Sequence, residues 1–162
     1  MARYLSLAAL ALLFAWGGCV LWRRLASDET QIRWRIEEAA EAFNAGRPGS
    51  AVAPLADAWF DRSSGIHKDT LHQMLVALVF QEKDEKGRFR CSVEVPRETL
   101  VIEVQEGGKA HATLEAAFFR KRTELREPEL QWRAAVEADL VDGEDGWQIV
   151  ATEHRTLEGA PH

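Results

Sequence analysis

The hydrophobic pattern of the chain begins with an uncharged run from Tyr4 to Trp22. The nineteen residues of this run would span about 28 Å as a helix, which is close to the hydrocarbon thickness of a bilayer. Aromatic side chains, which favour the membrane interface, stand at both ends of the run, and two arginines follow it. We therefore expect residues 1–24 to form a single-pass transmembrane anchor, in contact with the membrane through residues 4–22, and residues 25–162 to form one domain.

Other interpretations of this run remain open. A cleaved signal peptide would place its cleavage site at Ala15-Trp16-Gly17, a lipoprotein signal would use Cys19, and a soluble domain would bury the run as a core helix. The sequence also leaves open on which side of the membrane the domain lies. Arginines between positions 23 and 35 favour a cytoplasmic domain, whereas the short charged start is typical of an export signal. We expect the domain on the exported side, periplasmic or extracytoplasmic.

After the run, apolar residues recur at helical spacing in two segments. The first helix is expected to begin at Ser27 or Asp28, whose side chains can accept from free backbone amides, and to end at Gly46. Its apolar face holds Ile32, Ile36, Ala39, Ala40 and Phe43. The other helix follows the turn at 63–65, and its apolar face holds Leu71, Met74, Leu75, Leu78 and Val79. Between them we expect a short helix that Ser50 caps and that continues through Ala58.

From residue 90 onward the apolar period changes to two, as a β-sheet requires. Five strands are expected, around Cys91–Val95, Leu100–Gln105, Ala112–Phe118, Leu130–Leu140 and Trp147–Arg155. Phe118 and Trp132 fall on the apolar, inward sides of their strands. Glycine-containing turns at 106–109 and 142–146 are typical of hairpins. Helices followed by strands with short connections indicate an α+β fold, in which three helices cover one face of a mostly antiparallel sheet.

This order of elements resembles that of the nuclear transport factor 2-like superfamily, including its SnoaL-like members. The resemblance covers roughly Asp28 to Glu158 and rests on a long first helix, a helix after a glycine turn, and hairpins that end in the strand Gly146-Trp147-Gln148-Ile149-Val150. It implies a curved sheet that wraps the helices as a cystatin-type cone, an open end that can hold a hydrophobic small molecule, and a homodimer through the outer sheet face. The superfamily includes isomerases, cyclases and dehydratases beside domains without catalysis.

Candidate ligand-pocket residues are the large aromatics of the domain and two charged residues in the last strand. Trp59, Trp132 and Trp147 are large enough to floor a pocket, although tryptophans more often fill a core. Strand alternation places Glu153 and Arg155 with Trp147 on the inward face, where a carboxylate at a pocket mouth could act as a base. The alternative is a strand that leaves the core, with both charges in solvent.

The same alternation predicts an outward surface that could contact a partner. Its candidate residues are His111, Arg133, Glu137 and His154. Outward histidines are more often solvated or at a subunit interface than catalytic.

Several kinds of chemistry lack their usual residues. The net charge of −6 disfavours binding to a phosphate backbone, so no nucleic acid partner is expected. His67 and His72 are five apart rather than four, so we expect no metal site. No glycine-rich phosphate loop is present, and we expect no cofactor. The single tyrosine, Tyr4, lies in the predicted anchor, which removes the phenol that ketosteroid-isomerase chemistry uses. Cys91 is expected to be a small core residue.

These observations favour a membrane-anchored, noncatalytic module that binds a ligand or assembles with a protein. The alternative is a SnoaL-like small-molecule enzyme, of isomerase, cyclase or dehydratase type, that uses the pocket of the cone.

Overall fold

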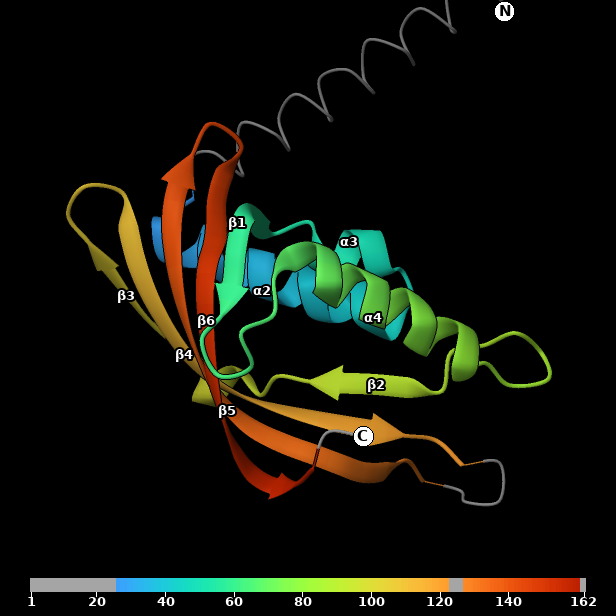
Figure 1. The fold of residues 1–162 in the computed structure, drawn as a ribbon. Helices are drawn as coiled ribbons and strands as arrows, with labels where there is room; N and C mark the ends of the chain where they lie inside the picture. Colours follow the sequence, from blue (N-terminus) through green and yellow to red (C-terminus); the bar gives the residue numbers. More distant parts are fainter. Residues whose placement is uncertain (1–25, 123–126, 161–162) are drawn as a thin grey trace, which may run out of the picture.

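The computed structural model describes residues 26–122 and 127–160 of the chain (Figure 1). The predicted anchor, residues 1–24, lies outside the described residues. Among the helices that are described, none is both long enough and apolar enough to span a membrane. The described residues form an α+β fold in which the helices lie on the concave side of a curved sheet (Figure 1).

The first described helix, α2 (Asp28–Asn44), begins where the sequence pattern places it. The hydroxyl of Ser27 accepts from the amide of Thr30 at 3.4 Å, and Ile32 and Ile36 are buried. Gly46 follows the helix with a φ of 63°, a conformation that a residue without a Cβ adopts readily. The prediction for this helix is confirmed.

The second helix and the segment after it differ from the sequence prediction. α3 (Pro48–Val52) has only five residues, so the prediction of a helix through Ala58 is wrong. Pro54 ends it because proline lacks the amide hydrogen that a continuing helix needs. The chain instead forms β1 (Leu55–Asp61), which pairs in parallel with the last strand. The sheet therefore gains an edge strand that was not predicted from the sequence.

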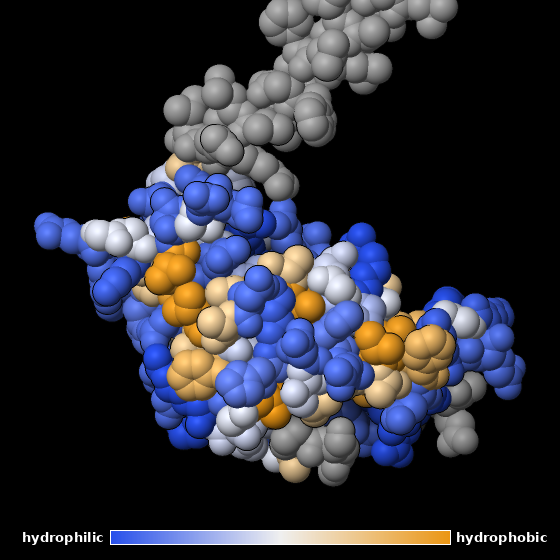
Figure 2. Space-filling model, turned by 45° about the horizontal axis from the view of Figure 1, so that its top comes forward, coloured by the Kyte–Doolittle hydropathy of each residue, from blue (hydrophilic) through white to orange (hydrophobic). Residues whose placement is uncertain are grey.

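The third helix, α4 (Lys68–Gln81), packs on α3 and β1. Leu71 and Leu75 reach the hydrophobic core, as their spacing predicts. Met74, which the same pattern placed on the buried face, is 54% exposed, and Phe80 is 74% exposed. Part of the apolar surface of α4 therefore remains exposed to solvent. Figure 2 shows a molecular face that is mostly hydrophilic, with separate hydrophobic patches.

The strands of the described residues form one six-stranded sheet in the order β1-β6-β5-β4-β2, and β3 also pairs with β4. The remaining elements are β2 (Cys91–Glu94), the 3-10 turn η1 (Arg97–Thr99), β3 (Val101–Gln105), β4 (Lys109–Arg120), β5 (Glu129–Gly143) and β6 (Gly146–Gly159). All pairs except β1–β6 are antiparallel. Because β2 and β3 pair with opposite ends of β4, two short strands share one sheet edge.

The core lies between α2 and the middle of the sheet. Ile32 of α2, Trp59 of β1 and Leu140 of β5 belong to one buried cluster. The sheet presents alanines to the helices at Ala112 and Ala138, which are 0% and 4% exposed. Each large apolar side chain that is fully buried here contributes about 1.5–3 kcal/mol to folding. This arrangement confirms the helix-filled cone that the order of elements predicts.

A β-bulge in β6 changes which of its residues face the helices. Ile149 pairs with Leu140, but Ala151 pairs with Asp139, so Val150 is an extra residue in β6. Residues directly opposite each other on paired strands share a face of the sheet. Residues 151–156 therefore move to the face opposite to the one that simple alternation predicts, until a second irregularity at Leu157 restores the original phase.

Three sequence predictions fail because of this bulge. Glu153 pairs with Glu137 and Arg155 with Ala135, both on the outer face, so the predicted inward position of these two charges is wrong. His154 pairs with Val136 on the inner face, so its predicted outward position is also wrong.

The end of β6 contains a glycine whose replacement we expect to be costly. At Gly159, φ is 73° and an added Cβ would overlap the backbone carbonyl of Gln131. Gly159→Ala should lower the free energy of unfolding by about 2–4 kcal/mol, because the paired backbones must separate. Gly65→Ala is the matched control, since φ is also 73° there and nothing lies within 4 Å of the added Cβ. Its cost should be about 1 kcal/mol, and equal losses for the two variants in urea unfolding would refute the clash.

Candidate functional site

A cavity of about 170 Å³ lies where the last turns of α2 and α4 meet β2, β4 and β5. Its lining is mostly apolar and consists of Phe43, Leu78, Glu82, Cys91, Phe118, Phe119, Arg120, Gln131, Trp132 and Ala160. Apolar lining with a few polar groups at the edge is the usual composition of a small-molecule site.

Aromatic rings form one wall of this cavity. Phe118 and Trp132 are cross-strand partners in β4 and β5, and their rings stack with centroids 5.0 Å apart at an angle of 22°. Phe43 meets Phe118 edge to face, with centroids 5.9 Å apart. Because β-strand pairing and helix packing fix these rings, they present a flat, preformed apolar surface.

The charged side chains at the cavity form ion pairs with one another. Glu82 accepts from Arg120 at 2.6 and 2.8 Å and from Arg90 at 3.1 Å, and its side chain is 14% exposed. Burial raises the pKa of the Cys91 thiol, and the charge of Glu82 adds to that effect. A thiol with a raised pKa stays protonated at neutral pH and is a poor nucleophile. Neither Glu82 nor Cys91 is therefore arranged as a catalytic group.

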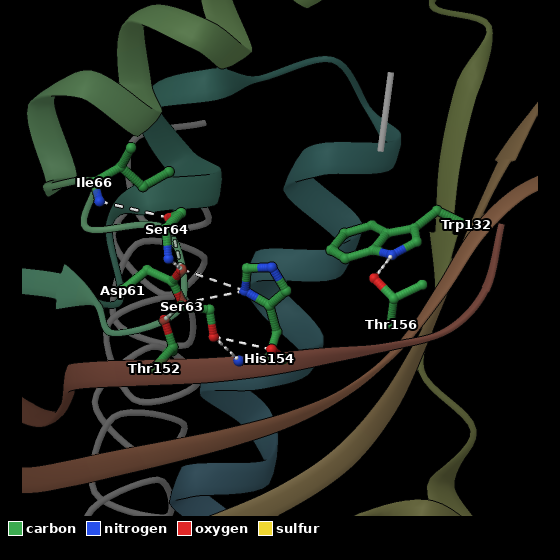
Figure 3. Close-up of polar contacts among 8 residues, drawn as sticks. All are labelled: Asp61, Ser63, Ser64, Ile66, Trp132, Thr152, His154 and Thr156. Carbon is green, nitrogen blue, oxygen red and sulfur yellow. Dashed lines mark hydrogen bonds and ion pairs between the residues drawn. The ribbon is translucent and has the colours of Figure 1, made fainter. Parts of the chain in front are cut away.

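A polar network on the same inner face centres on a buried carboxylate (Figure 3). Asp61, at the end of β1, is 4% exposed. It accepts from the hydroxyl of Ser64 at 2.6 Å, the amide of Ser64 at 2.8 Å and the hydroxyl of Thr152 at 3.1 Å. Nδ1 of His154 lies 3.3 Å from the same carboxylate. The parallel pairing of β1 with β6 brings these residues together, because Asp61 is directly opposite Thr152.

The environment of Asp61 keeps it ionised. Burial raises the pKa of Asp61, but the hydrogen bonds from Ser64, His154 and Thr152 together outweigh burial and hold that pKa below its ordinary value. We assign the hydrogen of the contact between His154 and Asp61 to Nδ1 of His154, since an ionised carboxylate can only accept. In the neutral imidazole, Nε2 is then an acceptor without a hydrogen.

The network adjoins the cavity through one ring contact. The imidazole of His154 lies edge to face against Trp132, with centroids 5.4 Å apart and an angle of 86°. Figure 3 shows the imidazole between Asp61 and Trp132, and the indole nitrogen donates to Thr156 at 3.0 Å. Ser63 holds the backbone of His154 through two hydrogen bonds, of 2.7 and 2.9 Å. The histidine is thus fixed beside the cavity wall, although it is not among the lining residues.

No family model matches the chain, and no curated protein matches it. Solved structures do match it. A nuclear transport factor 2-like protein with a cystatin-like fold from Novosphingobium aromaticivorans superposes with a TM-score of 0.66 at 15% identity, over 88% of this chain and 90% of that chain. The fold is nuclear transport factor 2-like. The resemblance inferred from the order of elements is confirmed at the level of the fold.

Other structures with the nuclear transport factor 2-like fold have diverse descriptions. A candidate scytalone dehydratase from the same species matches with a TM-score of 0.59 at 13% identity, over 78% of this chain and 82% of that one. A protein of unknown function from Nostoc punctiforme matches with a TM-score of 0.58 at 11% identity, over 80% and 91%. Similarity at these identities shows the fold alone, because one fold carries many activities.

The nuclear transport factor 2-like fold separates the predicted pocket residues. Trp132 lines the cavity, whereas Trp59 and Trp147 are core residues, 4% and 2% exposed. The indole nitrogen of Trp147 donates to Asp28 at 3.3 Å. Glu153 and Arg155 lie on the outer sheet face, away from the cavity lining.

Three of the four predicted partner-surface residues lie together on the outer face. His111 is 2.9 Å from Asp139, which also pairs with Arg62, and is 3.9 Å from Glu137. Further along the same face, Arg133 is 3.8 Å from Glu158. Hydrogen bonds from His111 and Arg62 outweigh burial and lower the pKa of Asp139, so this carboxylate stays ionised within the cluster.

Three site residues were not predicted from the sequence: Asp61, Phe43 and Phe118. Phe43 and Phe118 were placed correctly on inward faces, but periodicity cannot separate a ring that fills a core from one that lines a cavity. Asp61 precedes Ser63-Ser64-Gly65, and an Asp before such a turn commonly accepts from a backbone amide two or three residues later. That signal could have marked Asp61 as a turn residue. Among the described residues, no cluster of His, Cys, Asp and Glu could hold a metal ion.

Proposed function

We propose that this protein is a noncatalytic, membrane-anchored binding module that takes a small apolar group, the size of one aromatic ring, into the cavity beside Trp132. The observation that carries the proposal is the stacked pair of Phe118 and Trp132 in the wall of that cavity. Rings of a ligand gain about 0.5–1.5 kcal/mol from such aromatic contacts beyond their area burial.

The volume of the cavity limits the ligand. An apolar cavity of about 150 Å³ accepts benzene, whereas pockets for drug-sized ligands start at about 300 Å³. At about 170 Å³, this cavity fits a single ring or a short aliphatic group. The ligand can equally be a free small molecule or an apolar side chain of a protein partner.

The polar groups at the cavity support a binding role over a catalytic one. The carboxylate of Glu82 is shared between Arg90 and Arg120, and the thiol of Cys91 has a raised pKa. A general base needs an available lone pair within about 3 Å of the proton that it removes. Among the described lining residues, the one carboxylate is already committed to two guanidinium groups.

The membrane part of the proposal rests on the sequence. Residues 4–22 would cross the bilayer, and the domain would lie on the exported side. Only residues 25–27 separate the predicted anchor, residues 1–24, from α2, so the domain would stay within a short distance of the bilayer surface. Apolar ligands concentrate in membranes, which suits a module held there. The outer face around His111 and Glu137 is the surface that we propose for a homodimer.

A ligand titration of the full chain tests the binding function. The full chain in phosphatidylcholine nanodiscs is titrated with 4-fluorophenol, and the ligand is followed by fluorine NMR, with empty nanodiscs as the control for partition into lipid. We expect saturable broadening beyond that of the empty nanodiscs. A response equal to that of empty nanodiscs at every concentration would refute the proposal.

A second candidate function has one specific observation in its favour, the contact between His154 and the carboxylate of Asp61. A histidine whose Nδ1 is held by a carboxylate can accept a proton at Nε2. If the protein is such an enzyme, it should exchange the α-protons of cyclohexanone in D₂O, and His154→Gln should stop the exchange. The absence of exchange above buffer would leave the binding module as the supported function.

A further inference from the structure

A second concave site lies at the same end of the molecule as the apolar cavity. It has a volume of about 140 Å³ and is lined by Asp84, Arg88, Arg90, Lys121 and Arg122. Four of the five lining side chains are cations, in a chain whose net charge is −6. Three of these cations pair with protein carboxylates, Arg88 with Asp84, Arg90 with Glu82 and Arg122 with Glu129, but the cations still outnumber those carboxylates, so the site attracts an anion.

The two sites are built on neighbouring positions of the same strand pair. Cys91 and Arg120 are directly opposite each other and line the apolar cavity. One residue further along each strand, Arg90 and Lys121 line the basic site, and the amide of Lys121 donates to the carbonyl of Arg90 at 2.8 Å. The two sites are therefore adjacent but have different linings.

The loop that carries two of the cations has a fixed backbone. The carboxylate of Asp84 accepts from the amides of Lys86 and Arg88 at 2.9 and 2.8 Å, and Gly87 makes the turn at a φ of 74°. Phe89 packs edge to face against Phe43, with centroids 5.5 Å apart. The cations at positions 88 and 90 are thus held in place by the fold rather than spread along a loose loop.

The carboxylates near the site leave donors available. Asp84 also binds the Arg88 guanidinium at 2.8 Å, and Glu129 pairs with Arg122 at 2.9 Å. Among the described residues, the Lys121 ammonium has no hydrogen bond or ion pair. Nε of Arg90 is buried and makes no hydrogen bond, which is uncommon for a buried guanidinium nitrogen.

We propose that this basic site, Arg88, Arg90, Lys121 and Arg122, binds a compact oxyanion of the phosphate monoester class. Such a group carries a charge of about −1.5 to −2 at pH 7 and has three strong acceptor oxygens. Guanidinium groups match those oxygens with paired donors, and a lysine adds a point charge. This site does not depend on the ligand of the apolar cavity.

Two sources could supply the phosphate: a free phosphorylated molecule or a lipid headgroup. Figure 1 shows the 82–90 loop and the end of β4 at one end of the molecule, and the start of α2 at the other. The predicted anchor precedes α2, so it would enter the domain at the far end from this site. That placement favours a free phosphorylated molecule.

The test follows the arginine Nε–H resonances of the full chain in phosphatidylcholine nanodiscs by NMR. Inorganic phosphate is added at constant ionic strength, with sodium chloride as the balance. We expect a saturable shift of the Arg90 resonance. The double variant Arg88→Gln, Lys121→Gln should weaken that response about tenfold, because it removes two charge-assisted donors. Arg90 itself is kept, since it also bonds Glu82.

A matched variant and a lipid arm complete the test. Arg33→Gln removes one partly exposed cation from the first half of α2 and should leave the response unchanged. In the second arm, nanodiscs that contain phosphatidic acid replace the soluble phosphate. A shift of the Arg90 resonance that is seen only in this arm supports the site and indicates a lipid headgroup as the source of the phosphate. If neither arm shifts the Arg90 resonance, or if the double variant responds like the unmodified chain, the site is refuted.

Discussion

Cys91→Met should weaken the binding of 4-fluorophenol at least about tenfold while leaving the protein folded. Cys91 lines the apolar cavity from β2, and the longer methionine side chain would occupy the space that the ligand needs. Methionine is flexible and fills irregular gaps well, so the variant should be as stable as the unmodified chain to within about 1.5 kcal/mol. Fluorine NMR titration gives the affinity, and urea unfolding gives the stability.

The control for this prediction makes a comparable apolar enlargement elsewhere. Val104 in β3 is 44% exposed and lies outside the cavity, so Val104→Met should bind the ligand as the unmodified chain does. If Cys91→Met binds as tightly as Val104→Met, the ligand does not occupy the cavity.

Asp61→Ala should lower the free energy of unfolding by about 2–4 kcal/mol. The carboxylate is 4% exposed and accepts from Ser64, Thr152 and His154, so its removal leaves several donors near the core without a partner. Each buried donor that loses its partner costs about 1–3 kcal/mol, and neighbouring losses do not add fully. Asp57→Ala is the control, because that side chain is fully exposed and pairs only with Lys68; it should change stability by less than about 1 kcal/mol. Similar losses for both variants would contradict the network.

The contribution of Asp61 should also depend on pH. Its folded-state pKa is held below the unfolded value of about 3.9, because its hydrogen bonds outweigh burial. The carboxylate therefore stabilises the fold fully above that unfolded value, and its contribution is lost as the pH falls through the lower folded value. Asp61→Asn cannot titrate, so its stability difference from the unmodified chain should shrink below about pH 4. A difference that stays constant from pH 7 to pH 3 would contradict this assignment.

The helices and hairpins were predictable because their signals are local. A capping serine, an apolar face at helical spacing and a glycine turn define α2 and α4 within the sequence itself. The long alternating strands β4 and β5 are equally clear, since the buried Ala110, Ala112 and Ala116 of β4 and the buried Ala134, Ala138 and Leu140 of β5 fall at even spacings along each strand. The order of these elements was enough to predict the fold.

β1 could not be predicted in the same way. Its sequence, Leu55–Asp61, contains two alanines, which are compatible with a helix, and its exposed and buried residues do not alternate strictly. What makes it a strand is its pairing with β6, about ninety residues later in the chain. The secondary-structure propensity of residues 55–61 carries no information about a pairing partner that lies so far away in the chain.

The bulge at Val150 caused the largest error in the prediction of the site residues. A single extra residue moved His154 to the helix side and moved Glu153 and Arg155 to the outer face. Bulges depend on the register between two strands, and the sequence of one strand does not specify it. The histidine next to the cavity was thus assigned to the partner surface, and two surface charges were assigned to the pocket.

The cavity itself could not be predicted from the sequence either. Phe43, Phe118 and Trp132 were expected on inward faces, and they are there. Whether inward rings close on one another or leave space between them depends on how far the ends of α2 and α4 stand from the sheet. That distance is a property of packing and not of pattern.

The most direct test of the central claim is the position of the bound ring. Intermolecular nuclear Overhauser effects are measured between 4-fluorophenol and the full chain in phosphatidylcholine nanodiscs. The proposed function predicts contacts from the ligand protons to the rings of Phe43, Phe118 and Trp132, and their loss in Cys91→Met. Contacts to other residues alone, such as the exposed Phe80 on α4, would contradict it.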